Sequence, residues 1–296
     1  MSENQITIAA AIEAVTRQFE RAQLYFGHGT QTARDEAAWL VLHVAGKPLD
    51  GSFTDWGHVL SAEDGAQIKH LAERRASQGV PLAYLLGSAW FAGLEFEVNE
   101  DVLVPRSPIA ELILDGYRPW VDPERPLNIL DLCTGSGCIA IASAAHLPEV
   151  SVIAADISEQ ALQVAQANVT KHGLADRVQL VKSDLFQNVP SLAFDLIVTN
   201  PPYVSQDSMQ RLPDEYRAEP ALGLESGQDG LDAAPSIMLD APRFLGEYGV
   251  LICEVGESEQ ALVAALPELP FLWLEFSAGG HGAVSYTHLT LPTKIV

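Results

Sequence analysis

The sequence is poor in cysteine. Its 296 residues contain only Cys133, Cys138 and Cys253, an odd number set in apolar stretches. No disulfide framework is therefore expected. The spacing of the first two fits no common zinc signature and no histidine cluster accompanies them, so we predict no metal site. We expect all three side chains to be buried as small apolar groups.

Positive charge is also scarce. Lysine and arginine total 17 against 39 aspartates and glutamates, which gives a net charge of -22 and a pI near 4.5. A protein that binds nucleic acid non-specifically needs a basic surface to release counterions from phosphate, so this balance argues against duplex DNA as the main partner. It suits a small molecule or a basic protein. An acidity that serves only solubility is the alternative.

Long hydrophobic runs are absent. No stretch is long enough to span a bilayer, and the first residues lack the basic-then-apolar pattern of a signal peptide. We therefore predict a cytoplasmic protein. A hydrophobic content of 48% is ample for a buried core, and the length predicts one large or two modest domains.

The first ninety residues show helical patterning. Apolar residues recur at helical spacing between Ile6 and Phe26, and a second helix is predicted to end at Val44. Ser61 can cap a third helix that ends at Ser77. A short hairpin with Gly93 at its turn follows. We divide the chain into a helical domain (1–88), a hairpin and linker (89–119), a second domain (120–284) and a tail (285–296). The tail differs in composition, and we interpret it as non-native rather than as a final strand.

From Leu127 onward, strand-like and helix-like runs alternate. This order predicts an α/β fold with a doubly wound parallel sheet, in which ligands bind outside the carboxyl ends of the strands. The predicted strands are Leu127–Leu132, Ser151–Ile157, Val178–Val181, Phe194–Thr199, Gly249–Val255 and Phe271–Phe276.

A glycine-rich turn follows the first of these strands. Gly135 and Gly137 permit a tight turn and a close approach of the backbone to a ligand. The helix that begins there favours a negative group at its N-terminus, and Asp131 can accept a hydrogen bond from an ammonium group. A ligand with both groups is the amino-acid end of S-adenosylmethionine. The alternative is a plain strand–turn–helix corner.

Two further acidic residues stand at predicted strand ends. Asp156 suits ribose hydroxyls; the alternative is an N-cap for the next helix, which Ser158 can provide instead. Asp184 can accept from an adenine amino group, with Leu185 or Phe186 against the ring. The alternative for Asp184 is an ordinary turn.

Asn200-Pro201-Pro202-Tyr203 ends the fourth predicted strand, because neither proline can donate to a strand ladder. The asparagine carbonyl and the Pro201 carbonyl can each accept one hydrogen of a substrate NH2 group, while Tyr203 packs on its plane. An amide nitrogen is a poor nucleophile because its lone pair is delocalised, so this grip would orient it toward a methyl carbon. A cis-proline turn with a structural asparagine is the alternative.

Together these elements resemble the class I S-adenosylmethionine-dependent methyltransferases. Asn-Pro-Pro-Tyr narrows the resemblance to enzymes that methylate planar amino groups, and the segments 103–109 and 215–220 with Gly230-Leu231 are similar to the protein-glutamine methyltransferases. Residues 25–30, Ala89-Trp90-Phe91 and Arg106-Ser107-Pro108-Ile109 favour the branch that acts on ribosomal protein L-three. The resemblance implies a seven-stranded Rossmann-like sheet, a helical N-terminal domain for substrate recognition and a connecting hairpin.

The resemblance also implies roles for individual residues. Asn200, Pro201, Pro202 and Tyr203 would hold the glutamine amide. The S-adenosylmethionine site would comprise Asp131, Thr134, Gly135, Ser136, Gly137, Asp156, Ile157, Asp184, Leu185 and Asn200. For Glu254, contact with substrate or cofactor and a purely structural role both stay open. Arg106 would order the cleft wall or pair with a carboxylate.

Three other functions stay open at this point. The first is methylation of the Gly-Gly-Gln loop of release factors. The second is a DNA adenine methyltransferase, which the acidic charge and the lack of a basic target-recognition segment disfavour. The third is a non-catalytic cofactor-binding protein that supports ribosome assembly, which would have no need of the amide grip.

Overall fold

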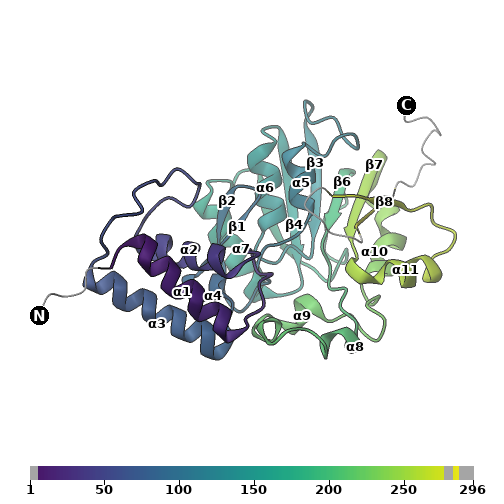
Figure 1. Cartoon of the computed structure of the whole chain (residues 1–296). Coiled ribbons are helices and arrows are strands. Elements are labelled where there is room, and N and C mark those ends of the chain that lie inside the picture. Colours follow the sequence, from purple (N-terminus) through teal and green to yellow (C-terminus); the bar gives the residue numbers. More distant parts are fainter. Residues whose placement is uncertain (1–5, 277–282, 287–296) are drawn as a thin grey trace, which may run out of the picture. The chain divides into compact units, whose positions relative to one another are not determined.

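The computed structural model describes residues 6–276 and 283–286 (Figure 1). The chain forms two compact units. The first comprises Met1–Ala89 together with Pro213–Ala218, and the second comprises Trp90–Leu212 and Glu219–Val296. No helix in the described part of the chain is long and apolar enough to cross a membrane.

The first unit is helical, as its apolar periodicity predicts. Its helices are α1 (Ile8–Ala22), α2 (Ala33–Val44), α3 (Ala62–Gln78) and α4 (Leu82–Leu86). Thr7, Thr32 and Ser61 cap the first three, because each side-chain oxygen accepts from the backbone N–H three residues on. The segment Asp214–Ala218 adds a 3-10 helix to this unit.

A buried ionic cluster joins the elements of the first unit. The Arg75 side chain is 1% exposed and pairs with Glu36 and Glu215, which are also buried. Its Nη2 donates to the carbonyl of Tyr25 at 2.9 Å, and the Tyr25 N–H donates to Glu215 at 2.8 Å. Every charge in the cluster is therefore paired and hydrogen-bonded, which offsets the cost of removing it from water.

The second unit contains the predicted seven-stranded sheet, with the order β5-β4-β3-β6-β7-β9-β8. Five strands are parallel, and β9 pairs antiparallel with both β7 and β8. The order reverses at β3, since β4 lies on one side of it and β6 on the other. The strands are β3 (Leu127–Leu132), β4 (Val150–Asp156), β5 (Val178–Lys182), β6 (Phe194–Thr199), β7 (Leu245–Glu254), β8 (Leu272–Leu274) and β9 (Ala283–Tyr286).

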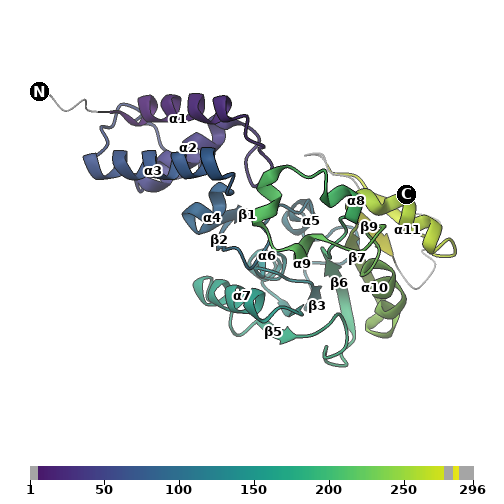
Figure 2. The same cartoon turned by 90° about the horizontal axis from the view of Figure 1, so that it is seen from below.

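Helices cover both faces of this sheet, as Figure 2 shows. One face carries α5 (Ile109–Leu114), α6 (Cys138–His146) and α7 (Glu159–Lys171). On the other face, α10 (Ala234–Asp240) and α11 (Glu259–Ala265) pack in one hydrophobic core with apolar residues of β3, β4, β6 and β7. Short helices α8 (Gln206–Met209) and α9 (Ala221–Leu224) lie between β6 and α10.

The hairpin predicted around Gly93 is present as β1 (Ser88–Phe91) and β2 (Leu94–Glu97). Ala92 and Gly93 both adopt positive φ at its turn, a backbone shape typical of two-residue hairpins. Of the tail predicted to be non-native, Ser285 and Tyr286 end β9, and residues 287–296 lie outside the described part of the chain.

The expectation that all three cysteines are buried was wrong for two of them. Cys253 is buried in β7, whereas Cys133 and Cys138 are partly exposed. These two partly exposed residues flank the glycine turn, where the chain leaves the sheet for α6. All three thiols are free.

Candidate active site

The carboxyl ends of the parallel strands meet at one edge of the sheet. Leu132 is in register with Ala155 on β4 and with Thr199 on β6, and Thr199 is in register with Cys253 on β7. The residues that follow these positions are therefore brought together, although up to 120 residues separate them in sequence. Because the strand order reverses at β3, this edge is where an open α/β sheet binds its ligand.

A cavity of about 460 Å³ opens at this edge. Seven of the predicted site residues line it: Gly135, Asp156, Ile157, Asp184, Leu185, Asn200 and Pro202. Six others, Asp131, Thr134, Ser136, Gly137, Pro201 and Tyr203, do not line it. The sequence reasoning missed the rest of the wall, which includes Glu100, Asp101 and Leu103 before α5, Pro220, Leu222, Gly223, Glu225 and Ser226 around α9, and Asp232 and Ala233 before α10.

The missed wall residues carry no catalytic signature. Leu103 and Pro220 belong to segments that only the family resemblance marked, and a loop leucine has no local pattern that would distinguish it. Gly223 shows how closely these segments pack: a Cβ there would lie 2.3 Å from Cδ1 of Leu103. Both are wall residues because the fold places their loops over the strand ends.

The glycine turn is built around Asp131. The Oδ2 atom of Asp131 accepts from the Thr134 hydroxyl at 2.5 Å and from the Ala140 N–H at 3.1 Å. Gly137 caps α6 at a φ of 80°, and a Cβ there would lie 3.2 Å from the Cβ of Ala165 on α7. The close approach that the sequence predicted at Gly137 is therefore helix–helix packing, while Gly135 faces the cavity.

Asp131 is fully buried behind the turn rather than exposed in the cavity. Burial raises its pKa to about 7, against the opposing hydrogen bonds from Thr134 and Ala140. Its Oδ1 atom is buried and has no hydrogen-bond partner within the described residues. A buried carboxylate oxygen without a donor is costly, and a positive charge on a ligand at the turn would favour the ionised form.

Asp156 ends β4 and faces the cavity. Its Oδ2 accepts from the Gly135 N–H at 2.8 Å, and its Oδ1 accepts from the Ser158 N–H at 2.9 Å. Burial raises the pKa of Asp156 despite these bonds. Ser158 caps α7 by accepting from the Ala161 N–H, so the capping alternative for Asp156 was wrong.

Asp184 and Leu185 line the same cavity at the end of β5. The Oδ2 atom of Asp184 accepts from the Gln187 side chain at 2.8 Å. Leu185 has a φ of 45°, and Cys133 at the end of β3 has a φ of 58°. Non-glycine residues in this left-handed region are strained, and such strain concentrates at binding sites.

The Asn200–Tyr203 tip follows β6. Asn200 and Pro202 line the cavity, Pro201 is buried, and the Tyr203 hydroxyl donates to Oε1 of Glu254 at 2.9 Å. The cis-proline alternative was wrong, because the one cis bond among the described residues is Arg118–Pro119. Arg106 pairs with a carboxylate, Glu219, through both terminal nitrogens.

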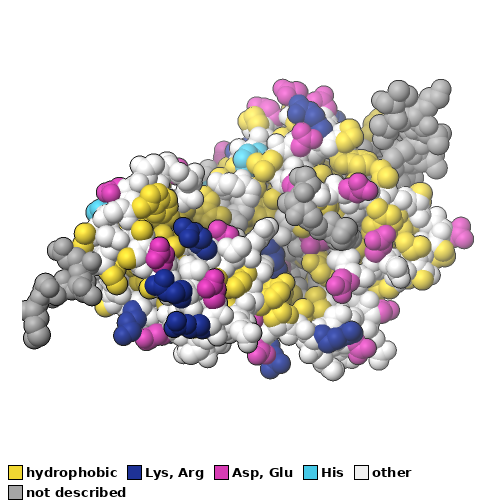
Figure 3. All heavy atoms as spheres, viewed as in Figure 1, with side chains coloured by type: hydrophobic (Ala, Val, Ile, Leu, Met, Phe, Trp, Pro, Cys, Tyr) yellow, Lys and Arg dark blue, Asp and Glu magenta, His cyan; other side chains and the backbone are white. Residues whose placement is uncertain are grey.

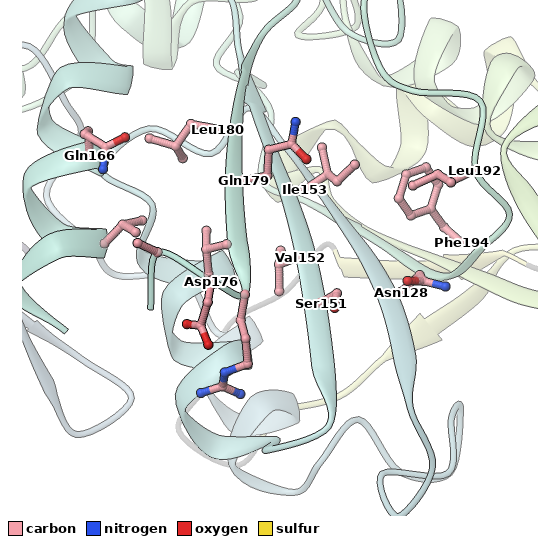
Figure 4. Close-up of a pocket in the computed structure, with 14 residues that line it drawn as sticks. Asn128, Ser151, Val152, Ile153, Gln166, Asp176, Gln179, Leu180, Leu192 and Phe194 are labelled. Atoms are coloured by element: carbon pink, nitrogen blue, oxygen red, sulfur yellow. The ribbon is translucent and has the colours of Figure 1, made fainter. Parts of the chain in front are cut away.

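A second hollow of about 630 Å³ lies elsewhere on the same sheet (Figure 4). Its wall includes Asn128, Ser151 and Val178, which stand at or next to the amino ends of β3, β4 and β5. Asp176 also lines it. The hollow is larger, but it lies at the opposite end of the strands from the glycine turn and the Asn200–Tyr203 tip, so we do not assign the active site to it.

Family models and curated relatives both identify the chain as similar to methyltransferases. The model of the methyltransferase small domain matches residues 121–215, and that of the PrmC N-terminal domain matches residues 15–87. A ribosomal protein uL3 glutamine methyltransferase of Neisseria meningitidis is 47% identical over 281 residues, covering 94% of this chain and 91% of the relative. The protein of that name from Xanthomonas campestris is 50% identical, covering 93% and 89%. The chain belongs to this glutamine methyltransferase family.

Solved structures agree on the fold. The catalytic domain of hMettl16 in complex with a MAT2A 3'UTR hairpin superposes with a TM-score of 0.53 at 16% identity, covering 85% of this chain and 95% of that one. This family uses S-adenosylmethionine, which is therefore the cofactor of the chain. The cavity fits it, because the lining offers acidic acceptors and apolar side chains.

Proposed function

We propose that the protein methylates the side-chain amide nitrogen of a glutamine in ribosomal protein uL3. The observation that carries the proposal is that Asn200 and Pro202 line the same cavity as Asp156 and Asp184. A group able to hold an amide therefore lies beside the acidic residues suited to the cofactor. The relatives named for uL3 are 46–50% identical to the chain over about nine tenths of its length.

Within this proposal, S-adenosylmethionine supplies an activated methyl group. Asp156 accepts from the ribose hydroxyls and Asp184 from the adenine amino group, while Ile157 and Leu185 pack on the ring. Thr134, Gly135, Ser136 and Gly137 shape the turn around the amino-acid end, with Asp131 behind it. Each of these assignments uses an acceptor or an apolar surface at the matching strand end.

The substrate amide is held by the tip in this proposal. The Asn200 side-chain carbonyl accepts one amide hydrogen and the Pro201 carbonyl accepts the other, which orients the nitrogen toward the methyl donor. Tyr203 would pack on the plane of the amide group. No residue of the chain forms a covalent bond in this step.

Charge supports a basic protein substrate. Residues 1–89 contain seven basic and ten acidic residues, whereas residues 90–296 contain ten and 29, a net charge of -19. In Figure 3, lysine and arginine side chains gather over α1 and α3. The catalytic unit thus holds most of the negative charge, which would attract basic segments. We propose that residues 1–88 recognise the substrate protein.

The three free thiols suit a reducing compartment, and we therefore propose that the protein is cytoplasmic.

The test is transfer of label from S-adenosylmethionine to purified uL3 and, separately, to a release factor, with mass spectrometry to locate the methylated glutamine. We expect label in uL3. Asn200→Ala should abolish transfer while cofactor binding, measured by calorimetry, persists. Label in the release factor alone, or near wild-type transfer by Asn200→Ala, would contradict the proposal.

A further inference from the structure

Glu254 is a buried carboxylate directly behind the Asn200–Tyr203 tip. It is the last residue of β7 and is 6% exposed. Its neighbour Cys253 is in register with Thr199, the residue that precedes Asn200. Glu254 does not line the 460 Å³ cavity, so its carboxylate faces protein groups rather than the ligand space.

Two hydroxyl groups donate hydrogen bonds to this carboxylate, one to each oxygen. Tyr203 donates to Oε1 at 2.9 Å, and Ser107 donates to Oε2 at 2.6 Å. Burial raises the pKa of Glu254, while these two hydrogen bonds and the positive charge of Arg106 act in the opposite direction. Each oxygen therefore has a donor, which is the condition for keeping a buried polar group in one position.

The segment that follows Glu254 holds Tyr203 at two further points. The Ser258 hydroxyl donates to the Tyr203 carbonyl at 3.0 Å. Gly256 lies against the ring, because a Cβ at this position would come within 2.4 Å of Cε2 of Tyr203. The hydroxyl, the ring and the backbone of Tyr203 are thus all fixed by residues 254–258.

The tip itself has little regular structure to hold it in place. It follows the last residue of β6, and its two prolines have no N–H to donate. Val204, the next residue, forms an isolated bridge with Glu225, in which its N–H donates to the Leu224 carbonyl at 2.8 Å and its carbonyl accepts from the Ser226 N–H at 2.9 Å. The contacts of Tyr203 are therefore the main side-chain anchor of the tip within the described residues.

We propose that Glu254 is a positioning residue, which fixes the Tyr203 ring and with it the amide-holding tip for methyl transfer. This inference rests on the proposed function of the tip. Misplacing a positioned group by about 1 Å costs on the order of 100-fold in rate. Loss of the carboxylate should therefore lower kcat and leave cofactor affinity unchanged, since Glu254 is outside the cavity.

The test compares Glu254→Ala, Glu254→Gln and Tyr203→Phe in the full-length protein. The glutamine can still accept from Tyr203 through its carbonyl and donate to the Ser107 oxygen, so it should rescue most of kcat. Alanine should lower kcat by roughly 10- to 100-fold, with the dissociation constant of S-adenosylmethionine within about twofold of wild type. The double variant Glu254→Ala/Tyr203→Phe should be no slower than the slower single variant.

Glu257→Ala is the matched control, because Glu257 is exposed and lies in the same segment. It should behave as wild type. Three results would overturn the inference: a glutamine variant as slow as alanine, multiplied losses in the double variant, or a loss of cofactor affinity and thermal stability that parallels the loss of kcat. The first would indicate a direct role of the charge, and the last a merely structural one.

Hydrogen exchange separates this inference from the proposed function. Amide exchange at Tyr203 and Val204, read by mass spectrometry, should rise in Glu254→Ala and not in Glu254→Gln, whichever protein is the substrate. If wild-type protein fails to methylate uL3 but exchange responds in this way, the function fails and the anchoring role stands. If uL3 is methylated and exchange at the tip is unchanged in Glu254→Ala, the anchoring role is wrong.

Discussion

The guanidinium group of Arg75 donates to the carboxylate of Glu215, a residue 140 positions further along the chain, at an Nη1–Oε1 distance of 3.3 Å. Glu215 also accepts from the backbone N–H of Tyr25. The pair lies in the interior of the helical unit, where neither side chain is more than 7% exposed. This contact fixes the short segment Pro213–Ala218 to helices from the beginning of the chain.

Removing Glu215 should destabilise the protein strongly. Glu215→Ala removes one of the two carboxylates that pair with the buried Arg75 charge. Breaking a buried pair in this way typically lowers the free energy of unfolding by about 3 to 5 kcal/mol. Guanidinium unfolding followed by circular dichroism measures the loss. Asp214→Ala in the same 3-10 helix is the control, because the Asp214–Arg217 pair is exposed and its removal should leave the midpoint unchanged. Equal effects of the two variants would contradict the role of the cluster.

Asp156→Ala should weaken cofactor binding. A charge-assisted hydrogen bond contributes about 1.5 to 3 kcal/mol, so the dissociation constant of S-adenosylmethionine should rise roughly 10- to 100-fold. Calorimetry gives the value. Asp176→Ala is the control, since Asp176 lines the larger hollow at the amino ends of the strands. A weaker cofactor complex in Asp176→Ala alone would place the site in that hollow instead.

Gly137→Ala and Gly135→Ala should differ in what they damage. Alanine at position 137 meets both a positive φ and close contacts with Ile141 and Ala165, so the protein should lose about 1 to 3 kcal/mol of stability. At position 135 a Cβ meets no atom within 4 Å, but the residue lines the cavity. That variant should lose cofactor affinity more than stability. Thermal unfolding and calorimetry on both proteins make the comparison, and the reverse pattern would refute the assignment.

Stability of the cofactor-free protein should fall as the pH rises from about 4 to about 7. Burial raises the pKa of Asp131 from 3.8 to about 7, so between these values the folded state holds a proton that the unfolded state has released. This contribution is fully present below about pH 4 and is lost as the pH rises through about 7. Asp156 and Glu254, whose pKa values are also raised, act in the same direction. Asp131→Asn should flatten the dependence of the unfolding midpoint between about pH 4 and 7; an unchanged slope would contradict it.

Cofactor binding should release protons near neutral pH. An ammonium group bound at the glycine turn would place a positive charge near Asp131, which would lower the pKa of this buried carboxyl and displace its proton. Calorimetry in two buffers of different ionisation enthalpy measures the number released, and Asp131→Asn should abolish most of it. Proton uptake on binding, or release that is unchanged in Asp131→Asn, would exclude this role.

Local patterns predicted the helices of the first unit and the parallel strands of the second, because apolar spacing records which face of an element is buried. The same patterns placed Asp156, Asp184 and Asn200 at strand ends, where all three line the cavity. They did not show that Gly137 packs against α7, where an added Cβ would meet Ala165. They also did not show that Asp131 is buried behind the turn. Whether a turn residue faces a ligand or a neighbouring helix depends on packing from a distant segment, which local spacing does not record.

The sequence by itself determined the chemistry that this protein can offer: a glycine turn before a helix, carboxylates at successive strand ends, and a rigid asparagine–proline tip. These follow from the bonding capacity of each residue and from the period of its element. Only the tertiary structure decided that Glu254 anchors Tyr203, that Glu215 pairs with Arg75, and that the loops around Leu103 and Leu222 close the cavity. Those contacts join residues 51 to 140 positions apart, so they exist only once the sheet order and the chain crossings bring the segments together.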